Sequence, residues 1–376
     1  MKTEAERQLA ALVAMPTISD DIPANDMALD YIEQYLAERG MYTERLRYDG
    51  HGALMASTRS GRKKSAVMLA AHVDVMAGDE TLFTLRRSGD KLSGRGTYDM
   101  KFAIAAYMQL VDELQDTLDE YDFNIMITTD EEYGGRDNIN AVPHLLDSGY
   151  GADVCILPDG GTDYKVERLA KGHWRFDLIA NGRTAHGSRP WEGESASFKL
   201  IEALRDLKAH FKGHGPDTNT LNIGFIRGGV TYNQIPDHMV AAVEIRIIDD
   251  ASRPAIERLV DTICKQHDVS YTHRVSHGVT VTDLKNPLAA DFMRSISKVT
   301  GKSAESCISY AASDGFYFAQ RGIPCILTRP VGGEHHGANE WISRDSFVRL
   351  TPILRDYIEK TGRIAATPVD TAAAVR

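Results

Sequence analysis

The sequence predicts an α/β fold with a mainly parallel sheet, interrupted by an inserted segment of different character. Up to about residue 170, short apolar runs alternate with stretches of helical periodicity, the order typical of a parallel sheet. From Lys171 the order becomes strand, helix, strand, strand, helix, strand, which is the ferredoxin-like pattern. After about Thr282, helix and buried strand alternate again. We therefore predict one domain from residues 1–170 and 283–376, and an inserted α+β domain from residues 171–282.

The elements of the outer domain follow from apolar spacing and from helix and strand stop signals. Two amphipathic stretches near the N-terminus end at Pro16 and Gly40, as helices do. Short, continuous apolar runs predict strands that are buried on both faces. In chain order we expect helices at 3–15 and 27–39, strands at 41–48, 53–58 and 65–71, a long helix at 100–118, a strand at 123–127, a short helix at 143–148, a strand at 153–157, and then, after the insertion, a helix at 287–300, a strand at 324–327 and a helix at 344–363.

The elements of the inserted segment show a different pattern. Its first strand alternates apolar and polar residues, with Trp174, Phe176 and Leu178 on one face, as in a sheet that is covered on one side only. The expected order is a strand at 173–180, a helix at 195–211, strands at 221–227 and 238–248, a helix at 251–267 and a strand at 269–275.

Composition excludes several classes of partner. The formal net charge of -10 and the lack of a basic stripe argue against nucleic acid and anionic membrane surfaces. The four cysteines form no Cys-x-x-Cys pair, which favours a reducing compartment. The N-terminus lacks the apolar core of a signal peptide, and no run approaches membrane-spanning length. We therefore expect a cytoplasmic protein.

Histidine and carboxylate side chains follow the predicted strands of the outer domain. In open α/β sheets the carboxyl ends of strands are where ligands bind, so these residues should meet at one edge. Histidine and carboxylate donors without thiolates suit zinc, cobalt or manganese, and one bridging carboxylate can hold two ions about 3.5 Å apart. The candidates are His72 with Asp74, Asp99 at a helix start, Glu131 with Glu132, Asp159, and one histidine of the pair His335-His336.

Each candidate also has an ordinary interpretation. His72-Val73-Asp74 alone is a weak signal, Asp99 could cap a helix, and Asp159-Gly160-Gly161 could be a turn. The three adjacent acids Asp130, Glu131 and Glu132 could form a solvent-exposed turn. Taken together, these interpretations require a coincidence at several successive strand ends, so we favour a metal site.

With these motifs in this order, the chain resembles the dinuclear metallohydrolases that include aminoacylase, acetylornithine deacetylase, succinyl-diaminopimelate desuccinylase, glutamate carboxypeptidase and several di- and tripeptidases. The resemblance covers nearly the whole chain. It implies a metallopeptidase catalytic domain that holds two divalent ions, zinc first, with cobalt or manganese as alternatives. In that pattern Asp74 would orient a ligand and Glu131 would be the general base. The implied metal ligands are His72, Asp99 as the bridge, Glu132, Asp159 and His336, which Asn339-Glu340 selects over His335.

The inserted domain resembles the lid, or dimerisation domain, of the same family. The stretch Gly182-Arg183-Thr184-Ala185-His186-Gly187 matches the lid motif whose histidine reaches the partner subunit's active site and stabilises the oxyanion. The resemblance therefore implies a homodimer. It also places Asn233 and Arg246 against the carboxylate of the substrate, a task for which an arginine is well shaped. Taken singly, His186 could be a surface histidine, and Arg246 could be a solvated residue paired with Glu244 or Asp249.

The implied function is hydrolysis of one amide bond in a small substrate with a free carboxylate. Asp159, rather than glutamate, favours a dipeptidase or exopeptidase, whereas Asn233 and Arg246 fit an N-acyl-amino-acid deacylase equally well. Two departures from the pattern are the residues Phe102-Ala103 after Lys101, and the alanines 311–312 where the desuccinylase has Gly and Thr. An inactive, metal-binding peptide-binding protein is a remote alternative, against which the intact Glu131 argues.

Overall fold

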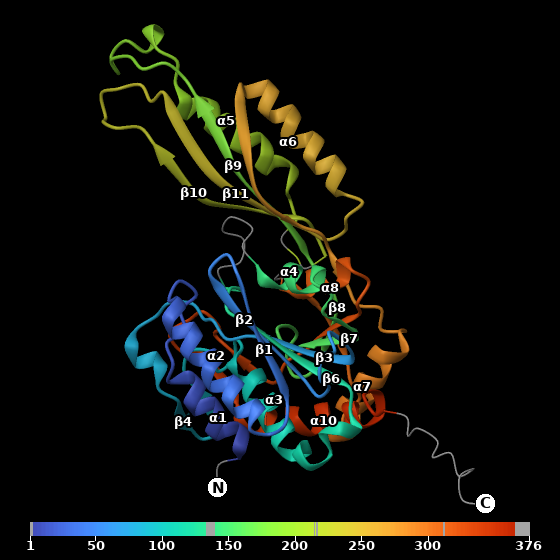
Figure 1. Ribbon diagram of the computed structural model, residues 1–376. Coiled ribbons are helices and arrows are strands. Elements are labelled where there is room, and N and C mark those ends of the chain that lie inside the picture. The colour runs from blue at the N-terminus through green and yellow to red at the C-terminus, as the bar shows by residue number, and fades with distance from the viewer. Residues whose placement is uncertain (1–2, 133–139, 214, 216, 311–312, 365–376) are drawn as a thin grey trace, which may run out of the picture.

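The computed structural model describes residues 3–132, 140–213, 215, 217–310 and 313–364. It has two lobes (Figure 1). The lower lobe contains the first and the last described elements of the chain, coloured blue and red, and the upper lobe contains the green to orange segment between them. Each lobe has its own hydrophobic cluster. The proposed domain boundaries stay a prediction.

A six-stranded sheet forms the centre of the lower lobe, in the order β1-β2-β6-β3-β7-β15. β6, β3, β7 and β15 are parallel, while β2 pairs antiparallel with β6 and β1 antiparallel with β2. β2 and β6 are buried along their whole length, as continuous apolar runs predict. This confirms the predicted mainly parallel sheet. The strands are β1 (Tyr42–Tyr48), β2 (His51–Ser57), β3 (Lys64–His72), β6 (Phe123–Thr128), β7 (Gly151–Leu157) and β15 (Cys325–Leu327).

Helices pack on this sheet and on one another. α2 packs against β2 and α3 against β3, while α10 packs against both α3 and α7. Phe102, Tyr107, Phe123, Phe292 and Tyr357 are among the largest fully buried side chains between these elements. The helices of this lobe are α1 (Glu4–Val13), α2 (Ile22–Ala37), α3 (Lys101–Leu114), α4 (Ala141–Asp147), α7 (Pro287–Thr300), α8 (Gly315–Gln320), α9 (Arg344–Phe347) and α10 (Leu350–Thr361).

Several predicted boundaries differ from the observed ones. α2 begins at Ile22, five residues before the prediction, because Asp21 caps it through the Ala24 N–H and Pro23 is accepted in the first turn. The predicted helix 100–118 ends at Leu114 and continues as the 3₁₀ segment Gln115–Glu120. The predicted helix 344–363 consists of α9 and α10, with a break between them.

Two small sheets were not predicted, because their strands are too short to show a period. One has the order β13-β8-β14 and the other β16-β17-β5-β4. Their strands are β4 (Arg86–Ser88), β5 (Lys91–Ser93), β8 (Val166–Ala170), β13 (Thr280–Val281), β14 (Ser306–Ser309), β16 (Gly332–Gly333) and β17 (Trp341–Ser343), and two further 3₁₀ segments are Glu80–Phe83 and Pro190–Glu192.

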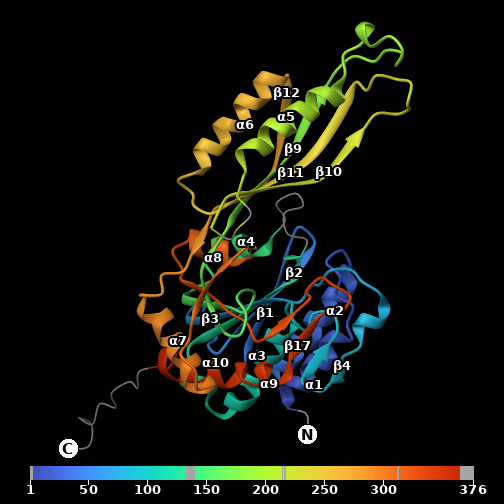
Figure 2. The same cartoon turned by 180° about the vertical axis from the view of Figure 1, so that it is seen from behind.

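The upper lobe is an antiparallel sheet with two helices on one face (Figure 2). Its strand order is β10-β11-β9-β12, so β10 and β12 are the edges. Trp174, Phe176 and Leu178 point to the buried face, as their alternation predicts. The elements are β9 (Gly172–Asn181), α5 (Ala196–His210), β10 (Thr220–Gly228), β11 (His238–Ile247), α6 (Arg253–His267) and β12 (Val269–His277), in the predicted order.

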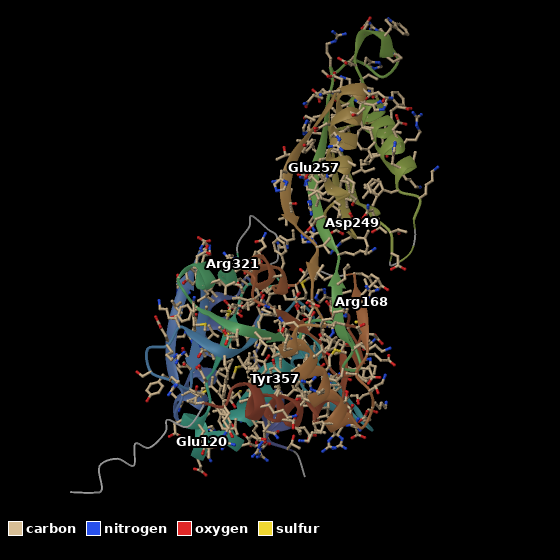
Figure 3. All side chains as sticks on the ribbon, turned by 90° about the vertical axis from the view of Figure 1, so that its right-hand side faces the viewer. Glu120, Arg168, Asp249, Glu257, Arg321 and Tyr357 are labelled. Atoms are coloured by element: carbon tan, nitrogen blue, oxygen red, sulfur yellow. The ribbon has the colours of Figure 1, made fainter. Side chains whose placement is uncertain are left out.

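A charged cluster on α7 and α10 supports a prediction about acid stability. Next to the buried Tyr357, which Figure 3 labels inside the lower lobe, Asp356 accepts from Ser295 Oγ at 2.7 Å and Lys298 Nζ at 2.5 Å, and it also pairs with Lys360. Burial favours the neutral acid, but these three partners outweigh burial and lower the pKa of Asp356 to about 2. A carboxyl group with a depressed folded-state pKa stabilises the fold above its unfolded pKa, near 4, and loses that contribution as the pH falls towards 2.

We therefore expect Asp356→Asn to lower the free energy of unfolding at pH 7 by about 1–2 kcal/mol, given that both lysines are solvent-exposed. The difference from the parent should shrink between about pH 4 and pH 2. Urea unfolding at several pH values measures this, with the exposed Asp119→Asn as control. A difference that does not change with pH would contradict the assignment.

Candidate metal centre

The strand-end residues gather at the carboxyl edge of the central sheet. His72 ends β3, Glu131 and Glu132 follow β6, and Asp159 follows β7. Asp99 comes just before α3. Two sets of side chains could each hold an ion, because within each set the ligand atoms all lie within 4.8 Å of one another. The first set is His72, Glu131 and Asp159, and the second is Asp99, Glu132 and His336.

Asp99 belongs to the second set and also faces the first. Its Oδ1 is 3.4 Å from His72 Nε2, and its Oδ2 is 3.1 Å from His336 Nε2. His336 Nε2 also lies 2.9 Å from Glu132 Oε2. A carboxylate whose two oxygens face two different sets has the geometry that a bridging ligand requires.

Two ligand atoms inside this cluster accept or donate no well-formed hydrogen bond within the described residues. His72 Nε2 and Glu132 Oε1 are buried and make no hydrogen bond to any residue in the described part of the chain. Buried polar atoms are normally paired, so atoms left unpaired and aimed inward suit a cation. The residues present therefore fit the two divalent ions that the sequence predicts.

The electrostatics of the cluster follow from crowding several acids with two histidines, of which His72 is buried and His336 is exposed. Burial disfavours a charged His72, but Asp74, Asp99 and Glu131 outweigh burial and raise its pKa well above the usual value. Asp99 and Glu132 raise the pKa of His336 to about 10. Burial, followed by the charge of Asp159, raises the pKa of Glu131 well above its usual value. Positive charge at this place would relieve the repulsion among the acids.

Asp74 ties the first set together, although it is not part of it. It is fully buried, and its Oδ2 accepts hydrogen bonds from Ser19 Oγ at 2.7 Å and from the Glu132 backbone N–H at 3.0 Å. Its Oδ1 lies 3.4 Å from His72 Nδ1 and accepts from the Glu131 N–H at 3.3 Å. Asp74 thus orients the histidine and also fixes the backbone that carries both glutamates.

A buried ion pair that the sequence did not reveal holds the second set. Glu340 Oε1 accepts the backbone N–H groups of Tyr98 at 2.8 Å and Asp99 at 3.1 Å, while its Oε2 pairs with Arg95 Nη1 at 2.8 Å. Arg95 also donates from Nη2 to the His336 carbonyl at 3.2 Å. The pair therefore links the segment that carries Asp99 to the segment that carries His336. The sequence indicates Glu340 only as the last residue of the motif that begins at His336, and no sequence pattern pairs it with Arg95.

We expect Glu340→Gln to weaken metal binding. The amide keeps the shape but leaves Arg95 as an unpaired buried charge, a change that typically costs about 3–5 kcal/mol. Loss of a group that supports ligands typically lowers metal affinity by about 10–100-fold. Competition with a chromogenic chelator measures the affinity. Glu305→Gln, which breaks an exposed pair with Lys165, is the control. Unchanged affinity in both variants would contradict this role for Glu340.

The structure does not bring every predicted site residue to this cluster. His186 and Asn233 are exposed and lie close together, because the Gly187 N–H donates to the Asn233 carbonyl at 2.7 Å. Their loops, between β9 and α5 and between β10 and β11, form the end of the upper lobe farthest from the lower lobe (Figure 1). Arg246 lies near the other end of β11 and pairs with Glu244 at 3.0 Å. Of the two adjacent histidines, His336 belongs to the second set, whereas the His335 ring faces Tyr98. The alanines 311–312 lie outside the described residues.

Known proteins are similar to this chain over most of its length. The succinyl-diaminopimelate desuccinylase of Marinobacter nauticus is 25% identical over 342 residues, which cover 86% of this chain and 90% of that protein. Human aminoacylase-1 is 26% identical over 342 residues, covering 81% of this chain and 82% of that protein. The crystal structure of a tripeptidase from Staphylococcus aureus, 20% identical, superposes with a TM-score of 0.79 over 95% of this chain and 97% of that one, which confirms the fold.

The family itself is identified by a family model. The model described as "Peptidase family M20/M25/M40" matches residues 68–360, which include every predicted metal ligand and the whole upper lobe. This match confirms the resemblance drawn from the sequence motifs. The chain therefore belongs to peptidase family M20/M25/M40 and is a metal-dependent hydrolase.

Proposed function

We propose that the chain is a dinuclear amidohydrolase that cleaves a dipeptide or another small peptide with a free carboxylate. The observation that carries the proposal is the position of Asp99, whose two oxygens face the histidines of two separate ligand sets. His72 and Asp159 would hold one ion, Glu132 and His336 the other, and Asp99 both. When bound, two such ions polarise the scissile carbonyl and acidify a water molecule, with zinc the first candidate and cobalt or manganese the alternatives.

Glu131 is the proposed general base. Its carboxylate is a partly buried member of the first set, with Oε2 3.8 Å from His72 Nε2. A base at this place would take the proton of the attacking water and pass it to the leaving amine. Burial and the neighbouring Asp159 both raise the pKa of Glu131, which favours a group that can hold that proton.

The proposed active form is a homodimer in which the upper lobe acts as a lid. His186 would stabilise the oxyanion in the partner's site, and Asn233 and Arg246 would bind the substrate carboxylate. Two features of the upper lobe support a second copy. β10 is an edge strand with unpaired backbone groups, and the edge strand and α5 expose large apolar side chains. These side chains are Phe225, Ile226, Phe198 and Ile201, exposed by 43%, 52%, 70% and 53%.

Within the described residues, no helix is both long and apolar enough to cross a membrane. Cys155 and Cys325 are direct partners on the paired strands β7 and β15, yet both are free thiols. Neighbouring free cysteines support the predicted reducing, cytoplasmic environment.

The alternative substrate is an N-acyl amino acid. It is favoured by the two relatives named above, since a desuccinylase and an aminoacylase are deacylases by name. The test is mass spectrometry of a pooled library of dipeptides and N-acyl amino acids, incubated with zinc- or cobalt-loaded protein and with Glu131→Ala as blank. Cleavage of dipeptides alone supports the peptidase, and cleavage of acyl conjugates alone supports the deacylase. If nothing is consumed while both ions are bound, an inactive peptide-binding protein becomes the better hypothesis.

A further inference from the structure

A partly buried arginine lies beside the candidate metal centre and has no role in the function proposed above. Arg329 comes two residues after β15, at the same edge of the sheet. Its Nε donates to the Gly161 carbonyl at 3.1 Å, and its guanidinium carbon lies 4.2 Å from the centre of the Tyr98 ring. Gly161 follows Asp159 by two residues, and Tyr98 directly precedes Asp99. The guanidinium therefore lies between two of the segments that carry predicted metal ligands.

The terminal nitrogens of Arg329 have no partner among the described residues. Neither Nη atom makes a hydrogen bond there, and no described carboxylate lies within ion-pair distance. Arg95, beside the second ligand set, differs in this respect, because it pairs with Glu340 at 2.8 Å. A charge that is partly removed from water and left without an anion is unfavourable, so a partner from outside the chain is expected.

The nearest acids do not fill that role. Burial lowers the pKa of Arg329, but Tyr98, Asp159 and Asp99 outweigh burial and raise it, so the group stays charged. Asp99 and Asp159 are predicted metal ligands, and bound ions would use their negative charge. Glu167 accepts the Gly161 N–H at 2.6 Å, and burial raises the pKa of Glu167 to about 7, so it is not a full counter-charge.

We propose that Arg329 binds a second carboxylate of the substrate, and that the preferred substrates therefore carry two acidic groups. The inference rests on the proposed function, in which Arg246 and Asn233 bind the first carboxylate from the lid. With Nε held by the Gly161 carbonyl and the guanidinium carbon placed over the Tyr98 ring, the two Nη groups are held in one place. A fixed fork of two donors matches the two oxygens of a carboxylate, which a lysine would not match.

The second carboxylate could belong to the acyl side or to the amine side of the scissile bond, and matched substrates distinguish the two. Glu-Ala against Gln-Ala tests the acyl side, and Ala-Glu against Ala-Gln tests the amine side. We expect wild type to prefer the acidic member of one pair, and Arg329→Met to lower kcat/KM for that member by about tenfold or more while changing the amide by less than about threefold. Arg329→Lys should recover only part of the loss.

The control is Arg87→Met, since Arg87 is an exposed arginine whose Nε also donates to a glycine carbonyl, at 3.2 Å. A merely structural Arg329 would lower kcat/KM for acid and amide members equally, and that result would overturn the proposal. Equal use of acid and amide by wild type would overturn it without any variant. Calorimetric binding of the same pairs to metal-loaded Glu131→Gln gives a readout without turnover. If no compound is cleaved but Arg329→Met weakens binding of only the acidic member, the proposed function fails while this inference stands.

Discussion

Replacing Glu131 by glutamine is expected to lower kcat by about 10³-fold or more while both metal ions stay bound. Glutamine has nearly the same size and can occupy the same buried place, but it cannot accept a proton at neutral pH. Asp74 holds this residue through its backbone N–H rather than through the side chain, so the substitution leaves that contact intact. Steady-state kinetics and metal analysis by plasma mass spectrometry on the same samples measure both quantities.

The metal content decides between two roles for Glu131. Its carboxylate lies in the same set as His72 and Asp159, so the geometry also allows it to be a ligand. Two ions per chain in an inactive Glu131→Gln protein would support the base. One ion per chain would instead make Glu131 a ligand, and retained activity would exclude both roles. Glu257→Gln, on α6 in the upper lobe (Figure 3), is the control for loss of a carboxylate.

The parts of the site that could be predicted are those in which local sequence determines position. His72 ends one apolar run and Asp159 closely follows another, and both runs are typical of buried strands. Parallel strands bring their carboxyl ends to one edge of the sheet. The upper lobe could be predicted for a similar reason. The strands before it are continuous apolar runs, whereas its first strand alternates apolar and polar residues. In both cases a pattern of a few neighbouring residues is enough to predict the element and where it ends.

The parts that could not be predicted depend on contacts between distant residues. Arg95 and Glu340 are 245 residues apart, and Ser19 and Asp74 are 55 apart, so no local pattern pairs them. The break between α9 and α10 also escaped prediction, because apolar spacing continues across it from Phe347 to Leu350. Arg329 has no signal in the sequence beyond its charge. Only the structure shows that it is partly buried beside the ligand sets and has no anionic partner in the described chain.

Mixing two inactive variants is expected to restore activity if His186 acts across the subunit interface. His186→Ala alone should lower kcat by about 10²–10³-fold, as loss of an oxyanion donor does. In a mixed dimer with Glu131→Gln, one site combines an intact Glu131 with the partner's intact His186, while the other site lacks both. If subunits exchange at random in a 1:1 mixture, half of the dimers are mixed and have one working site, which gives about a quarter of wild-type activity.

The position of His186 makes this outcome the expected one. Its side chain is exposed in the loop between β9 and α5, and that loop forms the far end of the upper lobe. Its Nδ1 lies 2.8 Å from Ser188 Oγ, a contact that fixes the ring and leaves Nε2 available. Within its own chain, that end of the lobe lies farthest from the ligand sets. A histidine that acted in its own chain would give no recovery, since neither site of a mixed dimer would then be complete.

His238→Ala is the matched control, because His238 is also exposed in this lobe and its Nδ1 also contacts one side chain, Asn181 Oδ1 at 2.9 Å. The His238→Ala variant alone should keep full activity. Mixing it with Glu131→Gln should give only the activity that the His238→Ala subunits contribute by themselves. Recovery that needs His186 specifically would therefore place its imidazole in the partner's site.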